Sequence, residues 1–280
     1  MINCGDIYKI FSECFPKLDR GEKNFSELLD IENADIMREY ANGKTVGFAV
    51  MRDGHILLMC VLPDHRRKGH GSALLEKCEN AAAEEGYHDV ILGDDNWFFL
   101  GAVLSESEYE KGSSDFFSKR RYSFSGGCME MSLNADNFVK ELIPDASAAD
   151  EFRFIRADER DMLLSAVAQV DSEWCQYFNE YENVFAAFSG GKIVSFCIAE
   201  SGCLTMLSRD GENVGSVGCV GTIPAARGQG TGLAMVGKVS EQLISWGCDV
   251  IYIHYTHLGK WYGKLGFEPF IYFGFGRKAL

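Results

Sequence analysis

Residues 220–233 read VGTIPAARGQGTGL, and this stretch decides the fold. A strand-like run ends before Pro224, a glycine-rich turn follows from Arg227 to Gly232, and apolar residues then recur at helical spacing. The first amides of a helix have no partner within the helix and lie at the positive end of its dipole. Because glycines let an anion approach the backbone closely, the stretch predicts a phosphate-binding turn between a strand and a helix.

The same pattern occurs earlier in the chain, where residues 59–72 read MCVLPDHRRKGHGS. In both copies proline precedes arginine by three residues, and 17 residues separate a loop glycine from a later glycine. Two motifs with the same internal spacing indicate a duplication. The matched positions are Pro63, Arg66, Gly69 and Gly86 in the first copy and Pro224, Arg227, Gly230 and Gly247 in the second.

Turn signals and helix ends give the remaining local structure. Asn42-Gly43, Asp53-Gly54 and Ser189-Gly190-Gly191 separate apolar runs and predict β-hairpins. The helix after each glycine turn should end at Gly86 or Gly247, and a strand should follow at 89–92 or 249–255. These elements predict an α/β (α+β) fold of two tandem domains, each a mixed, mostly antiparallel sheet with helices on both faces.

The chain length of 280 residues suits two domains. We expect an N-terminal domain at 1–134, a linker at 135–150 that contains Pro144 and a run of small polar residues, and a C-terminal domain at 151–280. The second copy should open with a strand at 152–156 and a helix at 159–170. The first copy should begin directly with a helix at 6–15, without an equivalent first strand.

The composition indicates which binding partners and which cellular compartment are expected. The formal net charge of −14 argues against a nucleic-acid partner, whose phosphates need a basic face. The ten cysteines include no C-x-x-C pair, so zinc spacings are absent and no metal is expected. The chain shows no secretory signal and no apolar run of about 20 residues, so it predicts a soluble, cytoplasmic protein with no membrane partner. Oligomeric state is not indicated.

Two other phosphate-binding motifs do not fit the glycine turns. A dinucleotide fold needs G-x-G-x-x-G, and neither copy supplies the third glycine after Gly71 or Gly232. The sequence G-x-x-x-x-G-K-[ST] of nucleotide kinases does not occur. An oxidoreductase that uses a dinucleotide nevertheless stays a rival hypothesis, which an absorbance spectrum of bound nucleotide would separate from coenzyme A binding.

At these turns the sequence resembles the GNAT superfamily of N-acetyltransferases. The family's Gln/Arg-x-x-Gly-x-Gly/Ala loop matches Arg66–Gly71 and Arg227–Gly232, and its aromatic-Tyr-x-x-Leu-Gly-Phe box matches Trp261–Phe267. The resemblance covers about residues 35–133 and 152–275. It implies acetyl-CoA as the acyl donor, and two neighbouring parallel strands that splay apart, here 215–222 and 249–255.

The resemblance also implies which residues hold coenzyme A. Strand-end backbone groups would bond the pantetheine arm, and the amides of the glycine turn would hold the pyrophosphate. In the second copy these residues are Val220, Gly221, Thr222, Arg227, Gly228, Gln229, Gly230, Thr231, Gly232 and Leu233. In the first copy they are Met59, Cys60, Val61, Arg66, Arg67, Lys68, Gly69, His70, Gly71 and Ser72.

The two copies differ where the family commonly places its general acid. Tyr262 occupies that position in the second copy, and its phenol can protonate a leaving thiolate at neutral pH. In the first copy Phe117 falls at this position and cannot donate a proton, and Arg121 replaces Gly266. We therefore expect the second copy to be catalytic and the first to be non-catalytic. An insertion at 97–99 in the first copy suggests a lid or a domain contact.

The general base is open at this stage. His254 lies near the end of the second splayed strand, and histidine is a common general base in enzymes, although a structural histidine is an equal interpretation. Glu173, Glu200 and a water relay are alternatives. The sequence thus predicts an acetyl-CoA-dependent N-acetyltransferase that acts on the amine of a small molecule, with a protein amine as the alternative acceptor. A non-catalytic acyl-CoA sensor is the other class of function that fits the pattern.

Overall fold

The computed structural model forms two compact units. Unit 1 comprises Met1–Cys128, Leu204–Gly211 and Ile271–Leu280, and unit 2 comprises Met129–Cys203 and Glu212–Phe270. The structure describes residues 5–16, 18–19, 21–30, 33–94, 99, 101–104, 113–180, 182–202 and 211–280.

Unit 1 contains the first copy of the repeated pattern. Its helices are α1 (Gly5–Cys14), α2 (Glu22–Leu29), α3 (His70–Glu84) and α4 (Ser113–Ser118). Its strands are β1 (Asp35–Ala41), β2 (Lys44–Arg52), β3 (His55–Val61), β4 (Asp89–Leu92) and β5 (Ala102–Val103), with parts of β6 (Ser123–Asn134) and β12 (Glu268–Ala279). The strand order is β1-β2-β3-β4-β12-β6, with β5 also on β12. In the described part of this unit β3 and β4 pair in parallel. The pairs β1–β2, β2–β3, β4–β12 and β5–β12 are antiparallel.

Unit 2 contains the second copy. Its helices are α5 (Arg160–Val170), α6 (Cys175–Glu180), α7 (Thr231–Ser245) and α8 (Gly259–Tyr262). Its strands are β7 (Glu151–Phe154), β8 (Val184–Ser189), β9 (Lys192–Ser201), β10 (Val214–Thr222) and β11 (Val250–Thr256). The order is β6-β11-β10-β9-β8-β7, in which β10 and β11 are parallel and the other pairs are antiparallel.

Each unit completes its sheet with a strand that follows the other copy along the chain. In unit 1 the end of β12 pairs with β4, with Arg277 opposite Ile91. In unit 2 the end of β6 pairs with β11, with Asn134 opposite Val250. The unit boundaries therefore differ from the expected domains: residues 271–280 belong to unit 1, and the expected linker at 135–150 belongs to unit 2.

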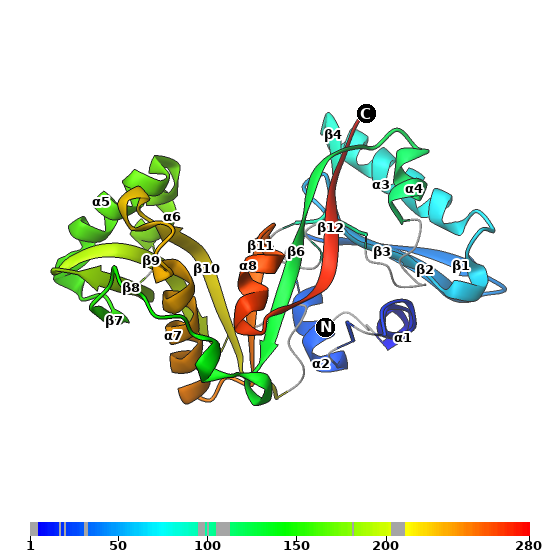
Figure 1. Ribbon diagram of the computed structural model, residues 1–280. Helices are drawn as coiled ribbons and strands as arrows, with labels where there is room; N and C mark the ends of the chain where they lie inside the picture. The colour runs from blue at the N-terminus through cyan, green and yellow to red at the C-terminus, as the bar shows by residue number, and fades with distance from the viewer. Residues whose placement is uncertain are drawn as a thin grey trace. The chain divides into compact units, whose positions relative to one another are not determined.

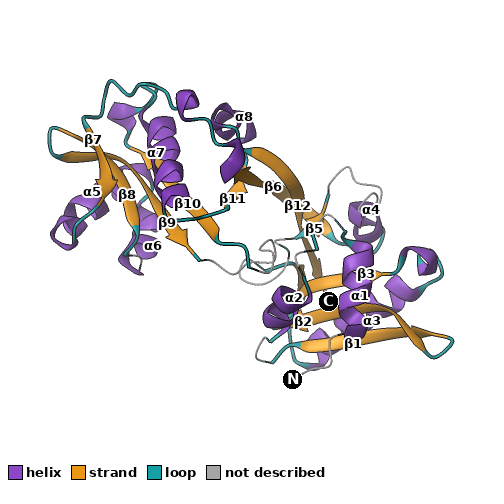
Figure 2. Cartoon of the chain, turned by 90° about the horizontal axis from the view of Figure 1, so that it is seen from below, coloured by secondary structure: helices purple, strands orange, loops and turns teal. Residues whose placement is uncertain are grey.

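Helices cover both faces of each sheet, as the sequence predicts (Figures 1 and 2). In unit 2, α7 packs on one face with Val217 of β10, and α5 packs on the other face with Phe196 of β9. In unit 1, α3 contributes Leu74 and Leu75 to a core with β2 and β4. No helix among the described residues is long and apolar enough to cross a membrane.

The hairpin turns form where the sequence places them, because their residues tolerate positive φ. Asn42 and Gly43 have φ of 51° and 73°, and Asp53 and Gly54 have φ of 51° and 76°. Positive φ at both central residues is the requirement of the type I′ turn. Gly86 and Gly247 likewise have φ of 87° and 90° just after α3 and α7, as expected of helix-ending glycines.

Thr231, the first residue of α7, carries a buried hydroxyl. The residue is 1% exposed, and its Oγ1 has no hydrogen-bond partner among the described residues. We expect Thr231→Val to raise the free energy of unfolding of unit 2 by about 1 kcal/mol, because an unsatisfied buried polar group carries a desolvation cost of about 1–3 kcal/mol. Urea unfolding followed by tryptophan fluorescence suits this test, because Trp174, Trp246 and Trp261 belong to unit 2.

Ser240 of the same helix is the matched control. It is also buried, but its Oγ donates to the Val236 carbonyl at 2.8 Å. Ser240→Ala removes a satisfied hydroxyl and should not stabilise the unit. If Thr231→Val destabilises unit 2 as much as Ser240→Ala does, the Thr231 hydroxyl has a partner in solution.

Candidate active site

The two parallel strands of unit 2 separate along their length. β10 and β11 pair from Val214 opposite Val250 to Ser216 opposite Tyr252. Beyond these residues β10 continues to Thr222 and β11 to Thr256, with no further pairs between them in the described register. This is the splay that the sequence predicts, and it leaves one edge of β10 free of a strand partner.

The other edge of β10 stays paired with β9 through a β-bulge. The register shifts between Gly218 and Gly221, and Cys219 within the bulge takes a left-handed φ of 49°. Ile223 donates its amide to the Val194 carbonyl of β9 at 3.0 Å. Since backbone groups alternate in direction along a strand, the backbone groups of Thr222 face away from β9, toward the open edge.

Ser195 of β9 fixes the end of β10. Its fully buried Oγ donates to the Gly221 carbonyl at 2.7 Å and lies 2.9 Å from the Thr222 hydroxyl. Gly221 itself cannot carry a side chain here, because a Cβ would lie 2.3 Å from the ring of Phe196. Gly221 is one of the three strand-end residues predicted to hold pantetheine. Its carbonyl points to β9 and away from the open edge.

The glycine turn follows directly. Arg227 bonds back to the strand through its Nε, which donates to the Thr222 carbonyl at 3.0 Å. Gly228 and Gly230 have φ of 76° and 79°, and a Cβ on Gly232 would lie 2.6 Å from the Thr222 hydroxyl. Gly230 precedes α7, and no side chain caps this helix terminus. The first amides of α7 are therefore left for an anion, which fits the pyrophosphate site that the sequence predicts.

Unit 1 repeats this turn closely. Arg66 donates its Nε to the Val61 carbonyl at 2.9 Å, and Gly69 precedes α3 with a φ of 96°. Arg67 takes a φ of 62° at the position where the other copy has Gly228. A left-handed conformation costs a residue with a side chain about 1–2 kcal/mol. Unit 1 therefore keeps the geometry of the turn although Arg67 is strained there.

The strand end of unit 1 differs in one contact. The thiol of Cys14 in α1 donates to the Val61 carbonyl at 3.3 Å, in addition to the bond from Arg66. The corresponding Thr222 carbonyl accepts from Arg227. The Val61 carbonyl, which the resemblance implies would bond pantetheine, thus already accepts hydrogen bonds from two side chains of unit 1.

Tyr262 lies in α8, close to the glycine turn of unit 2. Its ring contacts Trp261 and Phe267 at centroid distances of 4.7 and 6.2 Å, and Trp261 lies 3.5 Å from the position of a Cβ on Gly232. Burial raises the pKa of the Tyr262 phenol well above its ordinary value, and the nearby Cys197 adds to this shift. The phenol therefore stays protonated at neutral pH and can act as a proton donor.

Phe117 takes the corresponding place in unit 1, as the sequence predicts. It is 8% exposed and packs edge-on against Phe116, which lies 3.4 Å from the position of a Cβ on Gly71. Of the insertion at 97–99, Trp97 and Phe98 lie outside the described residues. Phe99 is buried and packs against Phe15 and Phe273.

His254 has a buried carboxylate partner that sequence reasoning missed. Its Nδ1 contacts Oε2 of Glu130 in β6, and the Tyr255 amide donates to Oε1 of Glu130 at 3.4 Å. Glu130 is 2% exposed, whereas the His254 side chain is 30% exposed. The sequence signal is a carboxylate inside the apolar run CMEMSL at 128–133, but the partner is 124 residues away.

The face on which His254 lies follows from strand alternation. Ile251 and Ile253 of β11 belong to the core beneath α7, so Tyr252 and His254 point to the opposite face, which α5 and α6 cover in this unit. The rings of Tyr252 and His254 stack at 6.1 Å. His254 therefore lies on the splayed part of β11, on the face opposite Tyr262.

The two other candidate bases lie elsewhere. Glu173 is exposed, with its amide bonded to Asp171. Glu200 of β9 lies opposite Ser216, where the β10–β11 pairing ends. Of the candidate bases, His254 is the one with a buried carboxylate that fixes its ring.

Comparison with known proteins agrees with this geometry. Both units contain a parallel strand pair followed by a glycine turn, and no side chain caps the helix that begins there. The acetyltransferase (GNAT) family model matches residues 5–98 and 148–267, and the chain belongs to this family. Acetyl transfer is the general activity of the family. A search of the curated proteins gives no match.

Solved structures with the same fold have low sequence identity. A glucosamine N-acetyltransferase region of a fungal multidomain GH3 β-N-acetylglucosaminidase has a TM-score of 0.75 at 18% identity, covering 99% of this chain and 37% of that one. A GCN5-related N-acetyltransferase from Sphaerobacter thermophilus has a TM-score of 0.65 at 16% identity, covering 98% and 91%. A tandem GNAT protein from the clavulanic acid biosynthesis pathway has a TM-score of 0.62 at 13% identity, covering 98% and 94%.

The Glu130 contact predicts a single tautomer for neutral His254. A carboxylate only accepts hydrogen bonds, so Nδ1 should carry the proton and Nε2 should be bare. Long-range ¹⁵N–¹H correlation spectra should show this tautomer in the wild type and a mixture in Glu130→Gln, whose amide can also donate. A wild-type spectrum dominated by the Nε2–H tautomer would contradict the contact.

Proposed function

We propose that unit 2 transfers the acetyl group of acetyl-CoA to the amine of a small molecule. The observation that carries this proposal is the free edge of β10, which leads into an uncapped glycine turn and has Tyr262 on one face of the sheet and His254 on the other. A transfer site needs a donor-binding edge, an acid and a base, and these three features occur together in one unit.

The donor would bind along the edge and the turn. The amides from Gly228 to Leu233 would hold its pyrophosphate, and the open-edge backbone groups of Val220 and Thr222 would bond the pantetheine arm. Gly221 would contribute by its lack of a side chain. Acetyl-CoA, when bound, supplies a thioester carbonyl for attack by an amine.

The side chains of unit 2 would then move two protons. The amine must lose a proton to attack, and Nε2 of His254 is the acceptor that the Glu130 contact leaves free. The departing thiolate needs a proton, and the buried phenol of Tyr262 is a donor that remains protonated at neutral pH. Glu130 is a positioning residue in this scheme, because it acts through His254.

For the acceptor we propose a chemical class, a small cationic amine. A net charge of −14 suits a cationic amine, and the fungal neighbour acts on glucosamine, which is a small amine. An acceptor screen with acetyl-CoA, read by release of free thiol, should therefore begin with amino sugars and other small amines. We place this reaction in the cytoplasm, since the eight cysteines among the described residues are free thiols.

Tyr262→Phe tests the general acid. The change keeps the buried ring and removes only the hydroxyl, so the fold and the acetyl-CoA dissociation constant should change little. The single-turnover rate of transfer should fall about 10²–10⁴-fold, the usual contribution of a positioned acid. Phe117→Tyr in unit 1 is the matched control and should leave the rate unchanged. A Tyr262→Phe rate within about threefold of wild type removes this residue from the mechanism.

A pair of turn variants tests which unit binds the productive donor. Gly228 of unit 2 and Gly69 of unit 1 both have positive φ, and neither Cβ would meet another atom within 4 Å. Asp at either position would meet no steric clash and would place a negative charge at the turn, but its positive φ would cost about 1–2 kcal/mol of stability. Gly228→Asp should lower kcat/KM by at least about tenfold, because a charge-assisted contact contributes about 1.5–3 kcal/mol.

Gly69→Asp should retain most of the turnover. Circular dichroism and isothermal calorimetry of both variants separate misfolding from lost affinity. If Gly69→Asp is folded and as inactive as Gly228→Asp, the catalytic role of unit 2 alone is wrong.

A further inference from the structure

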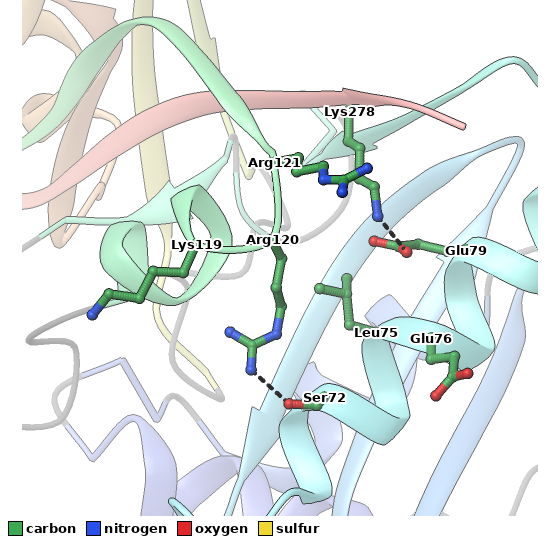
Figure 3. Close-up of a pocket in the computed structure, with 8 residues that line it drawn as sticks. All are labelled: Ser72, Leu75, Glu76, Glu79, Lys119, Arg120, Arg121 and Lys278. Atoms are coloured by element: carbon green, nitrogen blue, oxygen red, sulfur yellow. Dashed lines mark hydrogen bonds and ion pairs between the residues drawn. The ribbon is translucent and has the colours of Figure 1, made fainter.

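Unit 1 has a charged pocket beside its glycine turn. The pocket has a volume of about 390 Å³ and lies between one face of α3, the residues that follow α4, and the end of β12 (Figure 3). It begins at Ser72, the residue next to the turn at 66–71. Its lining residues are Ser72, Leu75, Glu76, Glu79, Lys119, Arg120, Arg121 and Lys278.

The equivalent groove of unit 2 is filled by protein. Gly237, which corresponds to Glu76, lies so close to Ile143 that a Cβ would be 2.7 Å from its side chain. At Gly266, which corresponds to Arg121, a Cβ would lie 3.5 Å from the Leu133 side chain, which is an ordinary packing contact. In unit 2 apolar side chains thus occupy the place that unit 1 leaves open and lines with charge.

Three of the four cations that line the pocket have side-chain partners among the described residues, and the carboxylate of Glu76 also lines it. Lys119 pairs with Asp115 at 3.9 Å. Lys278 pairs with Glu79 at 2.6 Å, and Arg120 donates to the Ser72 hydroxyl at 2.6 Å and stacks over Phe116. Figure 3 shows the Lys278–Glu79 and Arg120–Ser72 contacts, with Lys119 pointing away from Arg120. Arg121 has no ion pair or side-chain hydrogen bond within the described part of the chain, so its guanidinium is available to a ligand.

Arg121 is also held in a costly backbone conformation. Its φ is 72°, where the other copy has Gly266 with a φ of 89°. Such strain persists where the surroundings impose it and is often found at functional sites. Arg67, in the adjoining turn, likewise has a positive φ at a position where unit 2 has glycine, Gly228. Unit 1 therefore places two arginines at positions where unit 2 has glycine, one in the turn and one lining the pocket.

We propose that this pocket of unit 1 binds a phosphomonoester dianion. Arg121 and Arg120 would contact its oxygens, the Ser72 hydroxyl could donate to it, and Leu75 would line the side toward α3. A planar guanidinium matches phosphate oxygens in bidentate geometry, and an acidic protein gives such an anion few other sites. The phosphomonoester could come from the ribose phosphate of a coenzyme A held at the adjoining turn, or from a free phosphate.

Side-chain NMR and calorimetry with the full chain test this proposal. Inorganic phosphate should shift the Arg120 and Arg121 Nε–H signals in a saturable way. Arg121→Gly should weaken phosphate binding about tenfold or more without lowering the melting temperature, because glycine suits this φ. Lys264→Ala, at the position in unit 2 that corresponds to Lys119, is the control and should change neither quantity.

The source of the phosphate is tested in the Gly228→Asp background, which leaves the turn of unit 1 intact. If coenzyme A is the source, it should bind about tenfold tighter than dephospho-coenzyme A, and Arg121→Gly should abolish the difference. Equal affinities with saturable phosphate binding assign the pocket to a free or different phosphomonoester. The absence of saturable phosphate shifts, or unchanged binding in Arg121→Gly, overturns the proposal. Acetyl transfer by Arg121→Gly should equal that of the wild type, so failure here does not bear on the proposed function.

Discussion

In each unit one hydrogen bond, from an arginine Nε to the carbonyl at the end of the central strand, ties the glycine turn to that strand. Arg227 makes it to Thr222, and Arg66 makes it to Val61. This bond ties the turn to the strand, so the left-handed glycine that follows can start the next helix with its first amides uncapped. The same constraint keeps the strand edge next to the helix terminus, which is the arrangement that a long, phosphorylated thioester needs.

On this shared backbone the two units differ in chemistry. Unit 2 has an open strand end, a buried phenol at Tyr262 and a histidine fixed by Glu130. Unit 1 has Phe117 in place of the phenol, a strand end bonded by Cys14, and a pocket lined by cations. The duplication therefore preserves the uncapped glycine turn in both units, while the proposed acid and base occur in unit 2.

Local sequence predicted the parts of the fold that depend on local physics. Asn42-Gly43 can form only a tight turn between strands, and the glycines that end α3 and α7 are recognised by spacing alone. The partner of β12 could not be predicted in this way, because its pairing with β4 is set by topology over a long stretch of chain. The contact of His254 with Glu130 was missed for the same reason. The loop and Tyr262, by contrast, follow from contiguous motifs.

Hydrogen exchange of backbone amides tests whether the turn and the open strand edge of unit 2 hold the acyl donor. The full chain should be measured with and without saturating acetyl-CoA in the absence of an acceptor. Bound acetyl-CoA should slow exchange at Thr222, whose backbone groups face the open edge, and from Gly228 to Leu233, in the turn and the first residues of α7. Protection confined to residues 61–72, with none at 222–233, would contradict it.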